Sequence, residues 1–352
     1  MAAGGTGGHV IPALAVAREL RDRGREVIFW GTRGGVEARL APAGGFPIEW
    51  IEIGGLKNLG VARQVQSLLQ LGRATLQLRR EIEKRRPAAV FSMGGYVAGP
   101  SVIAAILANI PVVAMEPNAV PGLTNRAVGR RIVRALTGFE ETMRYFPAGR
   151  AERTGVPVRP EFFAIEAKPR TGVFHVLVTG GSQGSRTLNR AARDSWPLFR
   201  REGFAIRMTL QCGRNDSASD LRAQFESAGM EGAVEEFVDD MPAAFAEVDM
   251  IVSRSGAGCC AELAAAGKPA ILVPFPFAAG QHQLRNAAAI ERAGAARMVR
   301  DSEMTGRKLF EMVTSFAADD AGLRRMGDAA RSLAMPGAAR RAADVLEEAA
   351  RR

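Results

Sequence analysis

Short apolar runs alternate with amphipathic helical patterns along the whole chain, and this alternation restricts the fold more than any other feature. The strand candidates are Val27–Gly31, Ile48–Ile53, Ala89–Met93, Val112–Met115, Ile132–Thr137, Val176–Thr179, Ile206–Gln211, Val234–Phe237, Met250–Ser253, Ala270–Val273 and Ala296–Val299. The helix candidates between them include Pro12–Arg23, Arg63–Arg86, Ser101–Ala108, Ser185–Arg200, Ser219–Ala228, Cys259–Ala266 and Gln283–Ala293. Strands that alternate with helices predict parallel sheets covered on both faces. Because the pattern occurs twice, we predict an α/β protein with two doubly wound, Rossmann-like domains.

The predicted boundary between the domains is the stretch Thr154–Gly172, which contains three prolines and little periodicity. We expect a first domain at 1–157, to which a C-terminal helix at about 337–352 crosses back, and a second domain at 170–336. The first domain begins with a glycine loop instead of the strand that usually precedes one. The sequence therefore lacks residues for the central strand of the first sheet, and we expect the natural start to lie upstream.

The composition is that of a globular protein, with 352 residues, 47% hydrophobic and 24% charged. Lys and Arg exceed Asp and Glu by 47 to 37, and this favours an anionic partner: nucleic acid, anionic lipid or a phosphorylated substrate. Nearly all the basic residues are arginine, which a high-GC genome also produces, so charge does not choose among these partners. Three cysteines without a CxxC pair fit a reducing cytosol. The sequence shows neither a signal-peptide pattern nor a run of about 18 apolar residues.

Two glycine-rich loops each open a predicted helix. GGTGGH at residues 4–9 precedes the first helix, and GGSQGS at residues 180–185 follows the strand Val176–Thr179. Glycines let the backbone approach a ligand closely, and a helix N-terminus offers N–H donors to a phosphate; the plainer interpretation is a pair of tight turns. Neither loop fits the dinucleotide or the P-loop fingerprint, so NAD binding and P-loop chemistry are disfavoured. Two such loops, one in each domain, favour a ligand cleft between the domains.

Two polar clusters lie in the second half of the chain. In the cluster SRSGAG at 253–258, Arg254 can pair with a pyrophosphate, and Glu262 in the following helix can accept both hydroxyls of a ribose. The cluster QHQ at 281–283, with Asn286, carries amides that match sugar hydroxyls. The plainer interpretations are a carboxylate favoured by the helix dipole and a polar helix start.

Two further clusters, EPNAVPG at 116–122 and MGGY at 93–96, follow predicted strands in the first half. Ligands of α/β proteins bind at the carboxyl ends of parallel strands. These clusters therefore predict a second group of ligand contacts, contributed by the first domain.

Taken together and in this order, the clusters resemble the MurG family of peptidoglycan N-acetylglucosaminyltransferases. The matching stretches are GGTGGH at 4–9, GGY at 94–96, EPNAVPG at 116–122, TGVPVR at 154–159, GGSQGSRTLN at 180–189, FVDDM at 237–241, SRSGA at 253–257, AELAAAGKPAILVPFP at 261–276 and QHQLRNA at 281–287. They span essentially the whole chain. The resemblance implies a GT-B fold, with two Rossmann-like domains facing a cleft, the donor against the second domain and the lipid acceptor against the first.

The resemblance also implies an activity. This is the inverting transfer of N-acetylglucosamine from UDP-N-acetylglucosamine to undecaprenyl-pyrophosphoryl-N-acetylmuramyl-pentapeptide (lipid I), which gives lipid II for peptidoglycan synthesis. It implies no metal and no cofactor. The implied partners are the two substrates and an anionic membrane surface, with cell-wall synthesis or division proteins also allowed and nucleic acid excluded. The implied location is peripheral, on the cytoplasmic face of the cell inner membrane.

Residue roles carry over by position. The implied donor-binding residues are Thr6, Gly7, Gly8, His9, Asn118, Arg159, Ser182, Asn189, Phe237, Val238, Arg254, Glu262, His282 and Gln283. Phe237 would pack on the uracil, the Val238 backbone would read its edge, and Glu262 would hold the ribose hydroxyls. Ser182 and its loop would contact the phosphates, with Arg254 nearby in the donor pocket.

Other implied roles concern the transferred sugar and the acceptor. Gln283, with His282 beside it, would read the N-acetylglucosamine hydroxyls with the help of Asn118. His9, Thr6 and Tyr96 would belong to the acceptor side.

The chain departs from the family pattern at three places. It has Glu116-Pro117-Asn118 where members often have Glu-Gln-Asn, and Gln281 where they often have Asp. Cys259 and Cys260 replace small polar residues after SRSGA, which weakens the expectation that this stretch hydrogen-bonds the uridine.

His9 is the candidate catalytic base that would take the proton of the attacking muramyl hydroxyl, because imidazole titrates near neutral pH. In the alternative interpretation His9 positions the acceptor pyrophosphate. The helix start at 181–185 and Arg254 would stabilise the departing UDP in place of a metal ion.

The segment 56–86 is the candidate membrane surface. Its apolar residues Leu59, Val61, Leu68, Leu69, Leu71, Leu76 and Leu78 are interleaved with Arg63, Arg73, Arg79, Arg80, Lys84, Arg85 and Arg86. An apolar face rimmed by arginine is typical of an interfacial helix. An amphipathic core helix with a solvated basic face is the alternative.

Three other functions remain open at this stage. They are a GT-B transferase with a different lipid acceptor, such as diacylglycerol, a UDP-sugar epimerase, and a non-catalytic UDP-sugar-binding protein.

Overall fold

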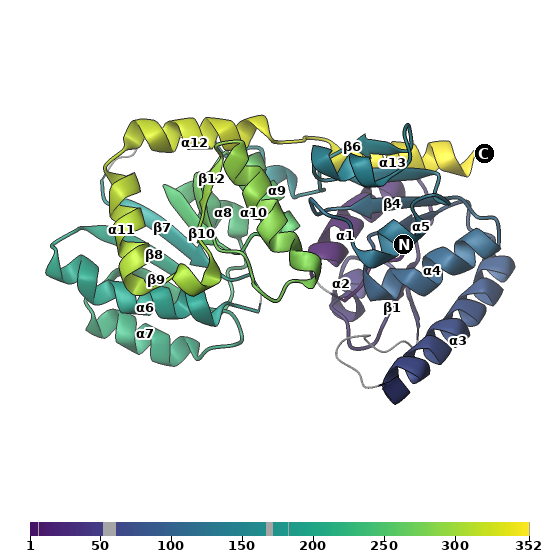
Figure 1. Ribbon diagram of the computed structural model, residues 1–352, viewed down its shortest axis with the longest axis horizontal. Coiled ribbons are helices and arrows are strands. Elements are labelled where there is room, and N and C mark those ends of the chain that lie inside the picture. Colours follow the sequence, from purple (N-terminus) through teal and green to yellow (C-terminus); the bar gives the residue numbers. More distant parts are fainter. Residues whose placement is uncertain (6, 52–60, 167–171, 182, 352) are drawn as a thin grey trace. The chain divides into compact units, whose positions relative to one another are not determined.

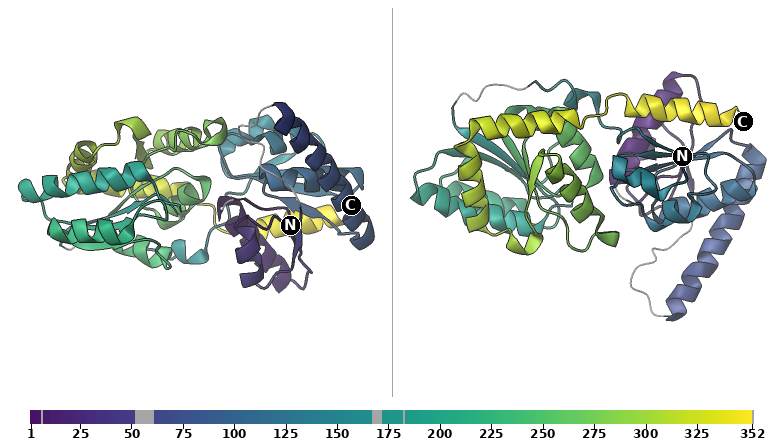
Figure 2. Two further views of the ribbon diagram at one scale, coloured as in Figure 1. Left: turned by 90° about the horizontal axis from the view of Figure 1, so that it is seen from below. Right: turned by 45° about the horizontal axis from the view of Figure 1, so that its top comes forward.

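A computed structural model describes residues 1–5, 7–51, 61–166, 172–181 and 183–351, without the side chains of 61–70, 96 and 97. The chain forms two compact units, Met1–Val158 with Met335–Arg352, and Arg159–Ala334. Both are α/β units with parallel sheets (Figures 1 and 2). Among the described helices, none combines the length and the apolar character needed to cross a bilayer.

The sheet of the first unit consists of short parallel strands. They are β1 (Phe29–Gly31), β2 (Ile48–Trp50), β3 (Val90–Ser92), β4 (Val112–Glu116), β5 (Arg134–Thr137) and β6 (Ala151–Arg153). Strands β3 to β6 pair in sequence order, whereas β1 pairs with β2. Ala2 forms parallel bridges to both Trp30 and Ser92, so it joins the two groups of strands.

The centre of this sheet corrects one expectation from the sequence. No regular strand forms there, but residues 1–3 occupy the position that the sequence was expected to leave without residues. The Trp30 N–H donates to the Met1 carbonyl at 2.9 Å, and the Ala2 N–H donates to the Phe91 carbonyl at 2.7 Å. Ala2 and Ala3 are fully buried. One bridging residue is enough because it pairs with both neighbours and so satisfies their ladder groups.

The helices of the first unit are α1 (Gly7–Asp22), α2 (Glu37–Ala43), α3 (Val61–Arg85), α4 (Gly95–Leu107), α5 (Leu123–Val128) and α13 (Ala338–Ala350). Helix α13, yellow in Figure 1, packs against α1. The guanidinium of Arg23, directly after α1, pairs with Asp344 of α13 at 2.6 Å and with Glu19 of α1 at 2.8 Å. Arg341 of α13 also pairs with Glu152 of β6 at 2.6 Å. These ion pairs hold the C-terminal helix α13 against the first unit.

Helices α1 and α4 begin earlier than the sequence indicated. The predicted starts were Pro12 and Ser101, but each helix continues through its proline and begins in a glycine-rich loop, at Gly7 and Gly95. A proline near the start of a helix removes only one backbone hydrogen bond, and burial of Pro12 and Pro100 offsets that loss. As a result, both helix N-termini lie at the glycine loops.

The second unit contains one six-stranded parallel sheet in the order β12-β11-β10-β7-β8-β9. The strands are β7 (Phe174–Thr179), β8 (Ile206–Gln211), β9 (Glu231–Glu235), β10 (Met250–Ser253), β11 (Ala270–Leu272) and β12 (Ala296–Met298). The helices are α6 (Arg186–Arg201), α7 (Ala218–Ser227), α8 (Met241–Glu247), α9 (Ala257–Ala266), α10 (His282–Arg292), α11 (Gly306–Ala317) and α12 (Asp320–Ser332). Helix α6 packs with α11 and α7, and α9 packs with α10 and α12.

Strand β9 lies earlier than its predicted range of Val234–Phe237. It begins at Glu231 and contains Gly232, whose φ of 126° suits glycine. A Cβ on Gly232 would lie 2.0 Å from the Met208 carbonyl oxygen, so only glycine allows this close pairing with β8. Phe237 therefore lies in the loop beyond the strand.

Candidate active site

Both sheets reverse their strand order at a central position. In the second unit the order departs in opposite directions from β7 and β10, and in the first unit from residues 1–3 and β3. Ligands of open α/β sheets bind at such switch points, beyond the carboxyl ends of the strands. The loops at these points are 4–9 and 93–96 in the first unit, and 180–185 and 253–258 in the second. These are four of the clusters that the sequence singled out.

In the first unit His9 lies between two glycine loops. Its Nδ1 atom is 3.4 Å from the Gly4 carbonyl oxygen. Gly95 has a φ of 80°, and a Cβ there would lie 3.3 Å from both Nδ1 and Cε1 of His9. The imidazole therefore packs against a position where glycine leaves room for it. Gly7 and Gly8 form the first residues of α1. Thr6 and the Tyr96 side chain lie outside the described residues.

A buried carboxylate organises the neighbouring loop after β4. Glu116 accepts hydrogen bonds from the backbone and side chain of Asn118, each at 3.1 Å, from the Gly122 N–H at 3.0 Å and from Asn125 Nδ2 at 2.9 Å. Burial raises the pKa of Glu116 above its ordinary value, and these donors act against that rise. The side-chain amide of Asn118, a predicted sugar ligand, thus donates to Glu116.

In the second unit the loop 180–185 is tied to the ends of two strands. The Gly181 N–H donates to Thr179 Oγ1 at 3.1 Å, and that hydroxyl donates to Gln211 Oε1 at 2.5 Å. Ser185 caps α6 by accepting from the Leu188 N–H at 3.3 Å. Ser182 lies outside the described residues. The described part of this loop is held by neutral groups, which suits binding of an anion at the helix start.

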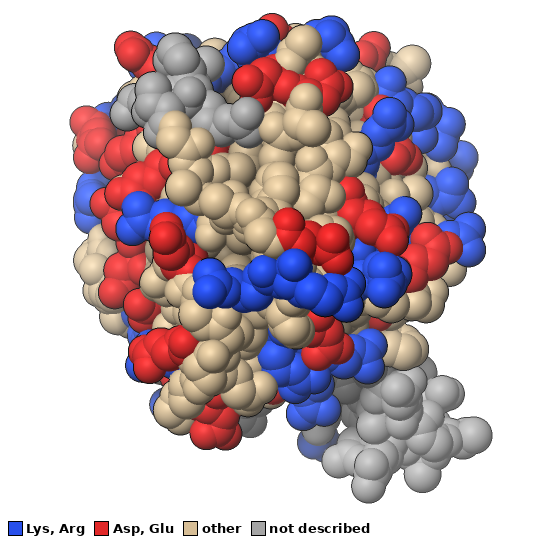
Figure 3. Space-filling view, turned by 90° about the vertical axis from the view of Figure 1, so that its left-hand side faces the viewer, with Lys and Arg blue, Asp and Glu red and all other residues tan. Residues whose placement is uncertain are grey.

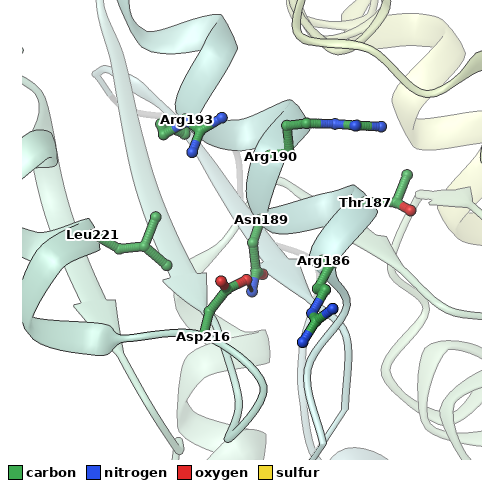
Figure 4. Close-up of a pocket in the computed structure, with 7 residues that line it drawn as sticks. All are labelled: Arg186, Thr187, Asn189, Arg190, Arg193, Asp216 and Leu221. Atoms are coloured by element: carbon green, nitrogen blue, oxygen red, sulfur yellow. Dashed lines mark hydrogen bonds between the residues drawn. The ribbon is translucent and has the colours of Figure 1, made fainter.

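Asn189 lines a pocket of about 260 Å³ beside α6, together with Arg186, Thr187, Arg190, Arg193, Asp216 and Leu221 (Figure 4). Its Nδ2 donates to the Cys212 carbonyl at 2.9 Å and to Asp216 at 2.7 Å. The side chain is buried and links α6 to the loop after β8. The three guanidiniums of the pocket point in different directions, so they do not converge on one anion (Figure 4).

Glu262, in α9, is the carboxylate predicted to hold a ribose. It is partly buried and accepts no hydrogen bond from the described residues. Burial raises its pKa to about 7, and the positive charge of Arg159 acts against this rise. The guanidinium carbon (Cζ) of Arg159 also lies 5.2 Å from the centre of the Phe162 ring. A carboxylate with no donor among the described residues can accept hydrogen bonds from the two hydroxyls of a ribose.

The two cysteines that depart from the family pattern lie next to this carboxylate. Cys260 is buried, and the Cys259 sulfur lies 3.2 Å from the Ser253 hydroxyl. Burial raises the pKa of the Cys259 thiol to about 12, so it is neutral near pH 7.

The Nη1 atom of Arg254 is bound by partners within the protein. It donates to the Val273 carbonyl at 3.0 Å and pairs with Asp301 at 2.5 Å, and Asp301 also accepts from the Thr187 hydroxyl at 3.1 Å. The structure thus places Arg254 in a network that joins the loop after β10 to α6. Nothing in the sequence pointed to Asp301 as its partner.

The start of α10 is bound to the loops after β10 and β11. Gln283 accepts from the Phe275 N–H at 2.9 Å through its side-chain oxygen, and its carbonyl accepts from the Ser255 hydroxyl at 2.8 Å. His282 Nδ1 lies 2.7 Å from the Ala279 carbonyl oxygen. The Gln283 amide nitrogen donates to no described residue, which suits a sugar hydroxyl. Phe237, the predicted uracil platform, is 54% exposed, and Val238 follows it in the same loop.

Two doubly wound units, each with a glycine loop at its switch point, are the architecture of glycosyltransferases with the GT-B fold. Residues 1–137 match the glycosyltransferase family 28 N-terminal domain, and residues 175–344 match the glycosyltransferase family 28 C-terminal domain. The chain belongs to glycosyltransferase family 28.

Relatives of known name extend this match over the full length. A protein of Solibacter usitatus, named UDP-N-acetylglucosamine--N-acetylmuramyl-(pentapeptide) pyrophosphoryl-undecaprenol N-acetylglucosamine transferase, is 60% identical over 100% of this chain and 96% of its own. A protein of the same name from Halorhodospira halophila is 42% identical over 99% of this chain and 98% of its own. The crystal structure of Acinetobacter baumannii MurG, 32% identical, superimposes with a TM-score of 0.83 over 98% of this chain and 97% of that one.

Proposed function

We propose that this enzyme transfers N-acetylglucosamine from UDP-N-acetylglucosamine to lipid-linked N-acetylmuramyl-pentapeptide, with inversion, in peptidoglycan synthesis. The observation that carries the proposal is the 60% identity, over the whole chain, to a relative named for this reaction. The site geometry supports it, because each unit offers the groups that one of the two substrates requires.

The second unit would bind the donor. The exposed ring of Phe237 can stack on the uracil, and Glu262 can accept the two ribose hydroxyls. The N-terminus of α6 can stabilise the charge that develops on the departing diphosphate. The amide nitrogen of Gln283, which has no acceptor within the described part of the chain, can donate to the sugar. In this proposal UDP leaves with the electron pair of the glycosidic bond and needs no cation.

The first unit would bind the acceptor and take up its proton. The muramyl hydroxyl attacks the anomeric carbon and releases its proton to His9, while the N-termini of α1 and α4 face the acceptor pyrophosphate. The alternative role for His9 is to position that pyrophosphate. The two roles differ in their kinetics, since loss of a base lowers kcat, whereas loss of a residue that only positions the acceptor raises the KM for lipid I.

The acceptor is a lipid, so we propose peripheral binding to the cytoplasmic face of the cell membrane through α3 and α4, which pack together. Leu76 of α3 is 59% exposed and Leu107 of α4 is 50% exposed. The side chains of Arg73, Arg79 and Arg80 on α3 are also exposed. Exposed apolar groups beside arginines are typical of a surface that binds anionic lipid.

The apolar face expected of the segment 56–86 needs one correction. Leu78 is 3% exposed and packs in the core with Ala74 and Ile82, which lie about one helical turn before and after it. Residues 56–60 and the side chains of 61–70 lie outside the described residues. The core interpretation therefore holds for Leu78, and the membrane interpretation depends on Leu76.

The distribution of charge favours a small membrane-binding surface over an extended groove for a polyanion such as nucleic acid. On the face of the molecule shown in Figure 3, Lys and Arg lie among Asp and Glu. Several arginines are also paired, among them Arg23 with Asp344 and Arg341 with Glu152. Each such pair contributes no net charge, so the net charge of +10 comes from basic residues outside these pairs.

A transfer assay tests the proposed function. The enzyme is incubated with UDP-N-acetylglucosamine and, in separate reactions, with lipid I, with diacylglycerol or without acceptor. We expect a glycosylated product only in the reaction that contains lipid I. A product with diacylglycerol would identify a different transferase, an altered free donor would identify an epimerase, and UDP binding without transfer would identify a binding protein.

A further inference from the structure

Glu37, the first residue of α2, has a fully buried side chain that the sequence did not single out. Its Oε1 accepts hydrogen bonds from the Thr32 N–H and from the Thr32 hydroxyl, both at 2.9 Å. Its Oε2 accepts from the Gly5 N–H, also at 2.9 Å. A buried carboxylate is costly unless its oxygens are hydrogen-bonded, and here donors from two segments converge on it.

Two glycines make the space for this side chain. A Cβ on Gly31 would lie 2.4 Å from Glu37 Cγ, and a Cβ on Gly35 would lie 2.1 Å from Glu37 Oε2. Neither glycine has a positive φ, so the turn itself does not require glycine at these positions. Their lack of a side chain serves to admit the carboxylate, which is then directed toward the glycine loop at 4–9.

The hydrogen bond from Gly5 links Glu37 to the candidate base. The Gly5 N–H and the Gly4 carbonyl belong to the same peptide group. Glu37 holds the N–H end of this peptide, and His9 Nδ1 lies 3.4 Å from its carbonyl oxygen. A peptide whose N–H donates to a carboxylate is polarised, so its carbonyl becomes a stronger acceptor. The order of groups is therefore carboxylate, peptide, imidazole.

We propose that Glu37 is a positioning residue that acts on His9 through the Gly4–Gly5 peptide. By fixing the plane of this peptide, Glu37 favours the tautomer in which Nδ1 carries the proton and donates to the Gly4 carbonyl. Nε2 is then the nitrogen with a lone pair for the hydroxyl proton of the acceptor. The inference rests on the proposed function, in which His9 is the base.

The test compares Glu37→Gln with Thr32→Val in the intact enzyme. In the first variant an NH2 group replaces one of two acceptors that face N–H donors, so the Gly4–Gly5 peptide loses its fixed orientation. The second removes one hydrogen bond from the same carboxylate but leaves the Gly5 contact intact, so it is a matched control for stability. We expect kcat to fall at least about tenfold in Glu37→Gln and less than about twofold in Thr32→Val. UDP affinity should change less than about twofold in both.

A double-mutant cycle shows whether Glu37 acts through His9. Glu37→Gln should lower kcat in the wild-type background but have no further effect in His9→Ala. Independent, multiplying effects would overturn the proposal, as would a kcat of Glu37→Gln equal to that of Thr32→Val. If the wild-type enzyme shows no transfer to lipid I, the proposed function fails instead.

A second measurement does not require activity. The chain has three histidines, so ¹⁵N NMR of labelled imidazoles can resolve His9, assigned by its absence in His9→Ala. We expect Nδ1 to be protonated and Nε2 to be unprotonated in the wild type, and we expect a mixture of the two tautomers in Glu37→Gln. The same tautomer in both proteins would overturn the inference even if the enzyme were inactive.

Discussion

The two units use the same loop geometry at their switch points but hold it with different chemistry. The second glycine of each loop has a positive φ, 89° at Gly5 and 78° at Gly181. Each of them donates its N–H to a side chain of its own unit. The acceptor is the Glu37 carboxylate in the first unit and the neutral Thr179 hydroxyl in the second.

This difference suits the two halves of the proposed reaction. A carboxylate behind the loop that carries His9 stabilises positive charge, which develops when the imidazole takes up a proton. A neutral hydroxyl behind the loop of the second unit leaves the positive end of α6 uncompensated for a departing diphosphate. The common backbone geometry thus supports proton uptake on one side and anion release on the other.

Replacing His9 tests the comparison most strongly. We expect His9→Ala to lower kcat by about 100-fold or more, since general bases contribute on the order of 10²–10⁴. UDP affinity should stay within about twofold, because its proposed ligands lie in the second unit. Steady-state kinetics with lipid I and calorimetry with UDP measure the two quantities. Turnover within about tenfold of wild type, about 1.4 kcal/mol, would assign His9 a positioning role instead.

Replacing Glu262 tests the donor side. A carboxylate accepts ribose hydroxyls better than an amide does, so Glu262→Gln should weaken UDP binding by about tenfold at pH 8. Because the pKa of Glu262 is raised to about 7, wild-type affinity for UDP should fall as the pH drops through 7, whereas the variant should show no such dependence. Calorimetric titrations at pH 6 and 8 measure both effects.

Although Glu262→Gln should weaken UDP binding, it should stabilise the folded protein. The folded-state pKa of Glu262 lies above its ordinary value of 4.5, so the folded protein loses stability as the pH rises from about 4.5 to about 7. Glu262→Gln removes this penalty and should be more stable than the wild type above pH 7, by on the order of 1–3 kcal/mol. Equal denaturation midpoints at pH 8 would show that the carboxylate is not destabilised.

A pair of glycine substitutions separates backbone strain from contact with His9. Gly95 and Gly24 have φ values of 80° and 77°, so Gly95→Ala and Gly24→Ala should each cost about 1–2 kcal/mol of stability. A Cβ at 95 would also press on the His9 ring, whereas one at 24, in the loop after α1, meets no atom within 4 Å. We expect only Gly95→Ala to show a further drop in kcat, of about tenfold, in assays run well below both melting temperatures.

The smallest expected effect concerns the membrane surface of the first unit. Leu76→Gln should reduce binding to vesicles with anionic lipid by several-fold, because it removes roughly one buried apolar side chain. Kinetics with a soluble acceptor should not change. Leu323, a buried leucine in α12 of the second unit, provides a control, since Leu323→Gln should lower stability without weakening vesicle binding in the folded fraction. Equal binding to neutral and anionic vesicles would contradict the proposed surface.

Residue patterns predicted most elements and the loops that form the candidate site, but they misplaced several boundaries. Helices α1 and α4 start before their prolines because burial offsets one lost hydrogen bond, which local propensity does not reveal. Strand β9 begins at Glu231 because Gly232 approaches Met208 closely, which depends on the neighbouring strand. Leu78 belongs to the core because of the way α3 packs, although its spacing also fits a membrane face.

The amino-acid sequence alone established the two α/β units, the glycine loops and the residue types at the proposed donor and acceptor sites. These features depend on local periodicity and composition, which can be recognised directly in the sequence. The tertiary structure decided which distant groups contact the site loops. The Gly5 N–H donates to Glu37, 32 positions away, and the Arg254 side chain pairs with Asp301. Such contacts arise only when packing excludes water and brings the partners of each buried polar group within hydrogen-bonding distance.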